Sequence, residues 1–436
     1  MLASFAALIA PALGQDDQDT DDQPVMSAPT FAGLKFRAVG PALMSGRIAD
    51  FAVNPDRPAE YFVAVCSGGV WKTVNNGVTY TPVFDNEGSY SIGCVTLDPN
   101  DHNVVWVGTG ENNSQRSVSF GDGVYKSIDG GQSWTNMGLE ESEHIGMIAI
   151  DPRDSDTVFV AAQGPLWRDG GDRGLYRTTD GGETWEKVLD ISEHTGINEV
   201  HIDPEDPDVM YASAYQRQRK VWTLINGGPE SGIWKSTDGG DTWREINKGL
   251  PDVDKGRIGL DISPVDHNVV YAIVEAADGK SGFYRSTDRG ENWEKMSDYA
   301  TSSPQYYNEI FASPHDVDTV YAMDTFMHVT HDGGKTFSRV PKVNKHVDNH
   351  ALWIDPDDPG HILAGCDGGI YETWDNAENW HYKANLPVTQ FYRVSTDMDE
   401  PFYNIYGGTQ DNNTLGGPSR TTRREGITNE DWLITV

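Results

Sequence analysis

The chain has 436 residues, and its 67 aspartate and glutamate residues outnumber its 33 lysine and arginine residues, which gives a formal net charge of −34. So negative a protein repels the phosphate backbone of nucleic acids, and we expect no nucleic-acid partner. No apolar run reaches the ~20 residues that a membrane-spanning helix needs, and we therefore expect no membrane span.

The first thirty residues are typical of an exported protein. Residues 1–14, "MLASFAALIAPALG", are similar to the apolar part of a secretory signal, with small residues before Gln15. They lack the usual basic start, so either the signal is atypical or the sequence starts too late. Residues 15–30 are acidic and polar, which predicts a disordered linker. We expect the protein to be secreted or periplasmic.

A short sequence recurs along the rest of the chain. "STDGGDTW", which begins at Ser236, has six relatives, and the seven octapeptides start at residues 73, 127, 178, 236, 286, 330 and 373. Before each one lie an apolar segment, a turn with proline and a second apolar segment, as in "HIGMIAIDPRDSDTVFVAA" of residues 144–162. Each unit therefore has four short antiparallel strands, a to d, with the octapeptide between c and d. Four such strands at a period of roughly 40–50 residues predict the blade of a β-propeller.

We interpret the octapeptide as structural rather than catalytic. Its Ser or Thr hydroxyl and its Asp carboxylate, Asp238 in this example, can accept hydrogen bonds from the amides of the turn. Glycine at the fifth position permits a positive φ, and the final Trp can pack against the blade. A catalytic Asp would not need to be repeated in every blade.

The pattern S/T-x-D-x-G-x-x-W resembles the Asp-box, or BNR, repeat of sialidases, xyloglucanase-like glycoside hydrolases and the sortilin ectodomain. Over residues 31–436 the sequence is most similar to the sortilin-type propeller of large secreted bacterial proteins that are often labelled glycosyl hydrolases. The resemblance implies a propeller. Because unrelated chemistries share that fold, it does not by itself imply an activity.

We predict an all-β fold, a β-propeller of four-stranded antiparallel blades. Seven octapeptide blades occupy residues 31–385, and residues 386–436 repeat the layout without an octapeptide, as an eighth, degenerate blade unit. Residues 34–39 resemble a spare outer strand, although every unit already has its own strand d. We therefore expect an open ring, cut from a longer propeller or a tandem propeller, with an unpaired blade edge that favours self-association.

The three cysteines, Cys66, Cys94 and Cys366, lie in apolar, strand-like runs, where we expect them to be small buried residues. Their odd number and the lack of short spacings argue against a disulfide framework and against a zinc site. We predict neither a bound metal nor a cofactor.

The loops between strands b and c are the expected binding surface. They lie on the face opposite the octapeptides, and units two to five carry long ones, such as "GENNSQRSVSFGDG" and "YQRQRKVWTLINGGPESG". Their amide, Arg and aromatic groups suit sugars and peptides, although solvated loops without a ligand are the alternative. The predicted ligand-binding residues of the rim are Glu111, Asn112, Tyr215, Gln216 and Trp222.

The segments that lead into the inner strands bring charged and imidazole groups to the mouth of the channel on the same face. The predicted floor of the ligand site consists of Arg47, His144, Arg257, Asn308, Glu309, Asp348, Asn349 and His350. In "HVDNH", strand spacing would place His346, Asp348 and His350 on one face, where they could hold a metal. We favour the alternative, in which they pair with neighbouring blades.

The main hypothesis for the function is a binding module for a peptide, protein or glycan, and a scaffold for a surface assembly is a further possibility. The alternative is a glycoside hydrolase, whose two carboxylates would lie about 5 Å apart for retention or about 6.5–9.5 Å apart for inversion. The catalytic candidates are Glu309, a proton donor that follows Tyr306 and Tyr307, and Asp348, a base. The resemblance to xyloglucanases implies an acid in a D-x-G-G-x-Y string, where this chain has "CSGGVW" with Cys66, and a second acid in another propeller.

Overall fold

The computed structural model describes residues 28–31, 33, 34, 37, 39, 40 and 43–435. It contains two compact units, Met1–Val39, which includes the 3-10 helix η1 (Ala28–Phe31), and Gly40–Val436. The expected signal, most of the expected linker and much of the expected spare strand at residues 34–39 lie outside the described residues. Within the described part of the chain, every helix is too short or too polar to cross a lipid bilayer.

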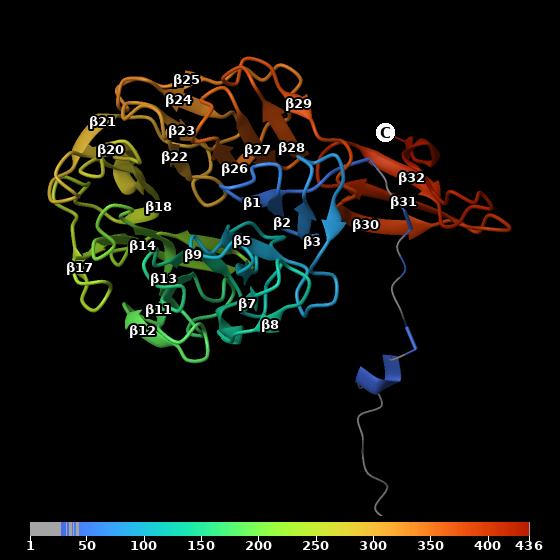
Figure 1. Cartoon of the computed structure of the whole chain (residues 1–436), viewed down its shortest axis with the longest axis horizontal. Coiled ribbons are helices and arrows are strands. Elements are labelled where there is room, and N and C mark those ends of the chain that lie inside the picture. Colours follow the sequence, from blue (N-terminus) through green and yellow to red (C-terminus); the bar gives the residue numbers. More distant parts are fainter. Residues whose placement is uncertain (1–27, 32, 35–36, 38, 41–42, 436) are drawn as a thin grey trace, which may run out of the picture. The chain divides into compact units, whose positions relative to one another are not determined.

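Within the described residues of the second unit, eight antiparallel sheets follow one another, and in all but the fourth the strands pair in chain order (Figure 1). The first sheet contains β1 (Ile48–Val53), β2 (Tyr61–Val65), β3 (Gly69–Thr73) and β4 (Thr81–Pro82), and the second contains β5 (Ile92–Leu97), β6 (Val105–Thr109), β7 (Val124–Ser127) and β8 (Thr135–Asn136). The third contains β9 (Ile145–Ile150), β10 (Val158–Ala162), β11 (Gly174–Thr178) and β12 (Glu186–Leu189). The fourth contains β13 (Thr195–Ile202), β14 (Met210–Lys220), β16 (Gly232–Ser236) and β17 (Arg244–Glu245), and β15 (Thr223–Asn226) pairs with β14 at its side. The fifth sheet contains β18 (Lys255–Ile262), β19 (Val270–Ala276), β20 (Gly282–Ser286) and β21 (Glu294–Ser297), and the sixth contains β22 (Ile310–Ala312), β23 (Val320–Ala322), β24 (His328–Thr330) and β25 (Ser338–Arg339). The seventh contains β26 (Asn349–Ile354), β27 (Ile362–Cys366), β28 (Gly369–Thr373) and β29 (His381–Tyr382). The eighth contains β30 (Phe391–Thr396), β31 (Asn404–Thr409), β32 (Thr414–Pro418) and β33 (Leu433–Ile434). Three further 3-10 helices are η2 (Glu140–Ser142), η3 (Ala277–Gly279) and η4 (Asn429–Asp431).

The first seven sheets are the blades of a closed β-propeller, which confirms the predicted fold class. Ile48 and Phe51 of β1 pack in one hydrophobic cluster with Ala351 of β26 and Leu363 of β27, so the first blade lies directly against the seventh (Figure 1). The expected open ring is therefore wrong. Seven blades close it without the eighth unit, because the apolar face of β1 finds its partner in the seventh blade.

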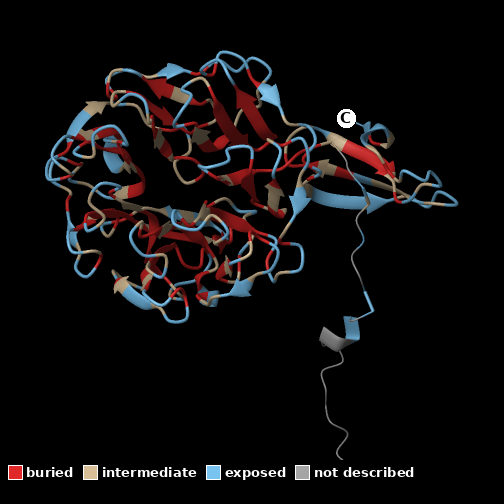
Figure 2. Ribbon diagram, viewed as in Figure 1, coloured by how far each residue is buried: buried red, intermediate tan, exposed pale blue. Residues whose placement is uncertain are grey.

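The eighth sheet lies beside the ring rather than in it (Figure 1). Its first strand, β30, is largely exposed, including Tyr392 and Val394, whereas the inner strands of the ring are buried (Figure 2). Among the described residues, β30 pairs with β31 alone, so its other edge offers unpaired backbone groups. Self-association through this edge stays a prediction.

The octapeptides form the turns between the third and fourth strands of their blades, as the sequence predicts. In the fourth blade, Ser236 Oγ accepts a hydrogen bond from Gly240 N at 2.9 Å, and Asp238 Oδ1 accepts one from Thr242 N at 2.9 Å. Gly240 has a φ of +87°, and a Cβ atom there would lie 2.6 Å from the ring of Phe159. The turn therefore needs glycine both for its backbone angle and for its contact with the preceding blade.

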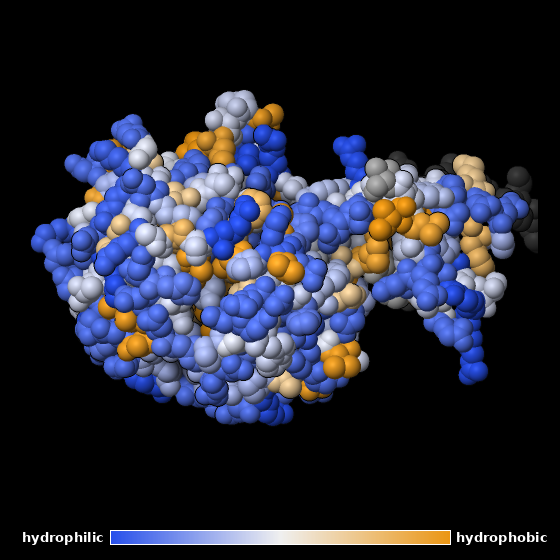
Figure 3. Space-filling model, turned by 90° about the horizontal axis from the view of Figure 1, so that it is seen from above, coloured by the Kyte–Doolittle hydropathy of each residue, from blue (hydrophilic) through white to orange (hydrophobic). Residues whose placement is uncertain are grey.

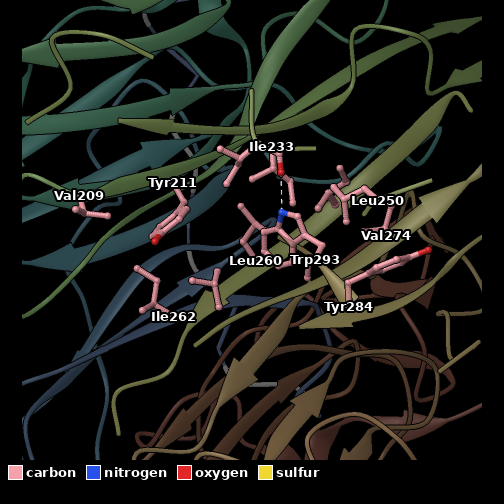
Figure 4. Close-up of a cluster of buried hydrophobic side chains, with 13 residues drawn as sticks. Val209, Tyr211, Ile233, Leu250, Leu260, Ile262, Val274, Tyr284 and Trp293 are labelled. Atoms are coloured by element: carbon pink, nitrogen blue, oxygen red, sulfur yellow. Dashed lines mark hydrogen bonds between the residues drawn. The ribbon is translucent and has the colours of Figure 1, made fainter. Parts of the chain in front are cut away.

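The last residue of most octapeptides fastens one blade to the one before it. Trp293 Nε1 donates a hydrogen bond to Ile246 O at 2.7 Å, and Trp185 Nε1 donates one to Met137 O at 2.7 Å. Figure 4 shows Trp293 inside a cluster of buried side chains from the fourth and fifth blades. Trp243 differs, because its Nε1 donates to Gly240 O in its own turn.

The three cysteines are buried and unpaired, as expected. Cys94 lies in β5, Cys366 ends β27, and Cys66 directly follows β2. All three fill space in or beside the strands of the ring and form no disulfide.

Replacing Asp238 with Ala should lower the free energy of unfolding by about 1 kcal/mol, because the turn amide of Thr242 loses its acceptor at the surface. Chemical denaturation measures this loss, with the exposed Asp357→Ala as the control, which should change stability little. Loss of ligand binding in folded Asp238→Ala protein would contradict a purely structural role.

Candidate functional site

The long loop between β6 and β7 crosses the channel on the face opposite the octapeptides. Ser114 N of this loop donates to Gln305 O of the sixth blade at 2.9 Å, and Asn112 Nδ2 donates to Glu309 Oε1 at 3.0 Å. From the fourth blade, Arg217 Nη1 donates to Asn113 O at 3.0 Å. Residues 110–123 are therefore held from both sides and cover this end of the channel.

Arg47 joins three parts of the ring beneath this loop. It precedes β1, and its Nε donates to Asp367 Oδ1 of the seventh blade at 2.9 Å, while its Nη1 pairs with Glu111 of the crossing loop. Its guanidinium lies 4.6 Å from the centre of the Tyr306 ring. All of these side chains are buried, so the charges are balanced inside the protein rather than by water.

Asp367 is the acceptor on which this cluster converges. Tyr306 Oη donates to its Oδ2 at 2.6 Å, and His350 Nε2 lies 2.9 Å from its Oδ1. Burial opposes its ionisation, but the charge of Arg47, the nearby His350 imidazole and the hydrogen bond from Tyr306 hold the pKa of Asp367 well below its usual value. Asp367 is thus an anion at neutral pH, held in a buried network.

The channel contains a cavity of about 170 Å³ below the crossing loop, and acidic side chains of the inner strands line it. Burial raises the pKa of Asp50 to about 7, that of Asp261 to about 6 and that of Glu309 to about 7, the last despite the neighbouring Arg257. Carboxyl groups whose pKa is raised toward neutrality mark a candidate functional site.

Most of these acids also connect the inner strands of adjacent blades. Asp50 Oδ2 accepts from Val95 N at 3.0 Å, and Asp261 Oδ2 accepts from Ala312 N at 2.7 Å. Backbone N–H groups on the inner strand edges need such acceptors, because no further strand pairs with them. Glu309 differs, since its carboxylate accepts hydrogen bonds from two side chains, Asn112 and Arg257, the latter donating from Nη2 at 2.8 Å.

The structure does not gather the predicted ligand residues around one open mouth. The buried ones are Arg47, Glu111, His144, Tyr215, Arg257, Asn308, Asn349 and His350, and the half-buried ones are Asn112, Gln216, Glu309 and Asp348. Trp222 is 82% exposed at the tip of the β14–β15 hairpin. The loop that carries Glu111 folds over the channel because Glu111 pairs with the buried Arg47. The ligand-binding role of these residues stays a prediction.

The two catalytic candidates lie in different surroundings. Glu309 lines the channel cavity, whereas Asp348 does not line it and instead accepts a hydrogen bond from Tyr307 Oη. The expected strand through "HVDNH" is wrong, because Asp348 has a φ of +61° and β26 begins one residue later. His350 therefore points to Asp367 rather than sharing a face with His346.

Sequence reasoning missed Asp50, Glu199 and Asp261 of the channel, and Asp367 of the Arg47 cluster. A signal for Asp367 was present. "CDGG" of the seventh blade repeats "CSGG" of the first, with an acid in the place of a serine.

Exposed aromatic rings gather in the loops of the same face as the crossing loop. Tyr90, Phe120, Trp167 and Trp222 are 63%, 71%, 46% and 82% exposed. They lie in the β4–β5, β6–β7, β10–β11 and β14–β15 connections. The surface seen in Figure 3 is mostly hydrophilic, with small separate hydrophobic patches, as the net charge leads one to expect.

Comparison with known proteins relates the chain to two groups. A family model described as "Sortilin, neurotensin receptor 3" (Sortilin-Vps10) matches residues 122–278. The xyloglucanase Xgh74A of Acetivibrio thermocellus is 27% identical over 220 residues, which are 45% of this chain and 24% of that protein. A xyloglucanase of Hypocrea jecorina is 25% identical over 243 residues, which are 50% of this chain and 27% of that protein. The chain thus spans about a quarter of the length of these relatives.

Solved structures share the fold. The GH74 xyloglucanase from Xanthomonas campestris superposes with a TM-score of 0.63 at 16% identity, over 86% of this chain and 59% of that one. YCF48 bound to D1 peptide superposes with a TM-score of 0.50 at 16% identity, over 78% of this chain and 98% of that one. The chain is a β-propeller that resembles xyloglucanases and sortilin-type propellers.

Replacing Arg47 with Met should destabilise the protein by about 3–5 kcal/mol, because Glu111 and Asp367 would stay buried without their shared cation. Urea denaturation measures the loss. The matched control, Arg153→Met, removes a half-exposed pair with Asp151 and Asp208 and should cost less than about 1 kcal/mol. Equal effects of the two substitutions would contradict the assigned role of Arg47.

Proposed function

We propose that this protein is a propeller of the glycoside hydrolase type that acts on a xyloglucan-like β-glucan. The sequence similarity to xyloglucanases supports this alternative better than a general module for peptides or proteins. Such a polysaccharide is met outside the cell, in keeping with the proposed secreted or periplasmic location.

The observation that carries the proposal is the set of exposed aromatic rings on one face. Sugar rings have flat apolar faces that stack on aromatic side chains, while their hydroxyl groups need polar partners at the edges. Tyr90, Phe120, Trp167 and Trp222 offer such rings from neighbouring blades. Amide and Arg side chains of the same loops supply the polar partners. An extended chain of sugars is the ligand that this spacing over several blades favours.

Glu309 is the proposed proton donor for hydrolysis. With a pKa of about 7, Glu309 is about half protonated in neutral solution and largely protonated in mildly acidic solution, as a general acid must be. The acids Asp50 and Asp261 are engaged by backbone amides of the next blade. A substrate would reach Glu309 when the Asn112 side chain gives up its hydrogen bond to it.

Replacing Trp167 and Trp222 together with Ala should weaken binding of xyloglucan by about fivefold to 150-fold, since each stacked ring contributes roughly 0.5–1.5 kcal/mol. Calorimetric titration with xyloglucan measures the change, with a peptide library as the second ligand. Trp374→Ala is the matched control, because Trp374 is 52% exposed in an octapeptide turn on the other face.

In the same proteins, Glu309→Gln should keep the ligand but lower any measured turnover by about two orders of magnitude or more. The proposed face would be contradicted if Trp374→Ala weakened binding and the double variant did not. Binding of a peptide with no affinity for xyloglucan would contradict the proposed substrate class.

A further inference from the structure

The turn between β31 and β32 of the eighth sheet meets the seventh blade. Asn412 Nδ2 donates to Gly368 O at 3.3 Å, and a Cβ atom on Gly368 would lie 2.7 Å from His346 Cγ. This close contact places Asp411 of the turn next to the segment that leads into β26. Two parts of the chain that are distant in sequence thus share one small space.

Three ligand-type side chains converge in this space. One ligand atom each of His346, Asp348 and Asp411 lies within 4.8 Å of the others, and all three residues are half-buried. An ion with bonds of about 2.0–2.2 Å to imidazole nitrogen and carboxylate oxygen needs only small rotations of these side chains. We propose that His346, Asp348 and Asp411 bind one divalent transition-metal ion of the zinc class, which fastens the eighth sheet to the seventh blade.

The second coordination sphere supports a metal ligand at His346. Its Nδ1 lies 2.8 Å from Val347 O, and since a carbonyl only accepts, this nitrogen carries the proton. Nε2 is then the bare nitrogen, available to a metal, and the ring orientation is fixed. Tyr307 Oη donates to Asp348 and orients that carboxylate in the same way.

A buried oxygen beside the cluster also lacks a partner. Gln410 is 4% exposed, and its Oε1 accepts no hydrogen bond from the described residues. Its Nε2 lies 3.5 Å from Asp411 Oδ2. The Gln410 amide thus borders the cluster, and a water on a bound ion is a candidate donor for its oxygen.

The ligand set selects among cations. Ca²⁺ and Mg²⁺ prefer oxygen ligands throughout, whereas a set of one imidazole and two carboxylates suits Zn²⁺ or Mn²⁺. Zn²⁺ should bind more tightly than Mn²⁺, following the general order of affinities.

The test is calorimetric titration of the whole chain with ZnCl₂ after treatment with chelator. We expect one tight site per chain, with affinity at least tenfold lower in His346→Ala and in Asp411→Asn. The matched controls are His381→Ala and Asp357→Asn, which remove an exposed imidazole and an exposed carboxylate elsewhere and should bind as the unaltered chain does.

Hydrogen exchange gives a second readout. Bound Zn²⁺ should slow exchange in β31 and β32 of the unaltered chain, and should not do so in Asp411→Asn. Zinc affinity that is the same in all five proteins, or no tight site at all, would overturn the proposal. Because none of these measurements uses a glycan, failure of the metal site would leave the proposed function standing.

Discussion

One buried guanidinium sets the arrangement of this propeller. Arg47 stands at the start of the first blade and binds Asp367 of the seventh and Glu111 of the loop that follows β6. The first contact joins the two blades that close the ring, and the second draws the loop over the channel. Both carboxylates are buried. Without Arg47 they would have neither water nor a cation to balance their charge, which would cost much free energy. Ring closure and channel cover are thus parts of one network.

This network explains why the proposed binding surface lies outside the channel. The crossing loop places Asn112 over Glu309 and leaves a cavity of about 170 Å³, too small for a polysaccharide. The aromatic rings of the neighbouring loops remain exposed around it. Recognition on the loops and a protonated acid beneath them are compatible, provided that the Asn112 contact opens when the ligand binds.

The sequence was sufficient for features that local spacing determines. Each octapeptide contains both the donors and the acceptors of its own turn, so Ser236 and Asp238 could be assigned correctly without a structure. The number of blades in the closed ring could not be predicted from the sequence. It depends on the packing of Ile48 with Leu363, which are more than three hundred residues apart in the chain.

The site was harder to predict for the same reason. Glu111 was expected on an open rim, but its position follows from a distant partner, Arg47. Within "HVDNH" a strand was expected, yet the positive φ of Asp348 breaks the alternation, and Asp411 from the eighth sheet takes the place next to His346 that His350 was expected to fill. Contacts between blades decide these positions, and they leave no periodic signal in the sequence.

The most direct test of the account is amide hydrogen exchange with and without a xyloglucan oligosaccharide. We predict slower exchange on binding in residues 86–91, 110–123, 163–173 and 216–231, which are the loops that carry or adjoin the exposed rings, and no change in the octapeptide turns. Protection confined to the octapeptide turns, or no protection anywhere at saturating oligosaccharide, would contradict it.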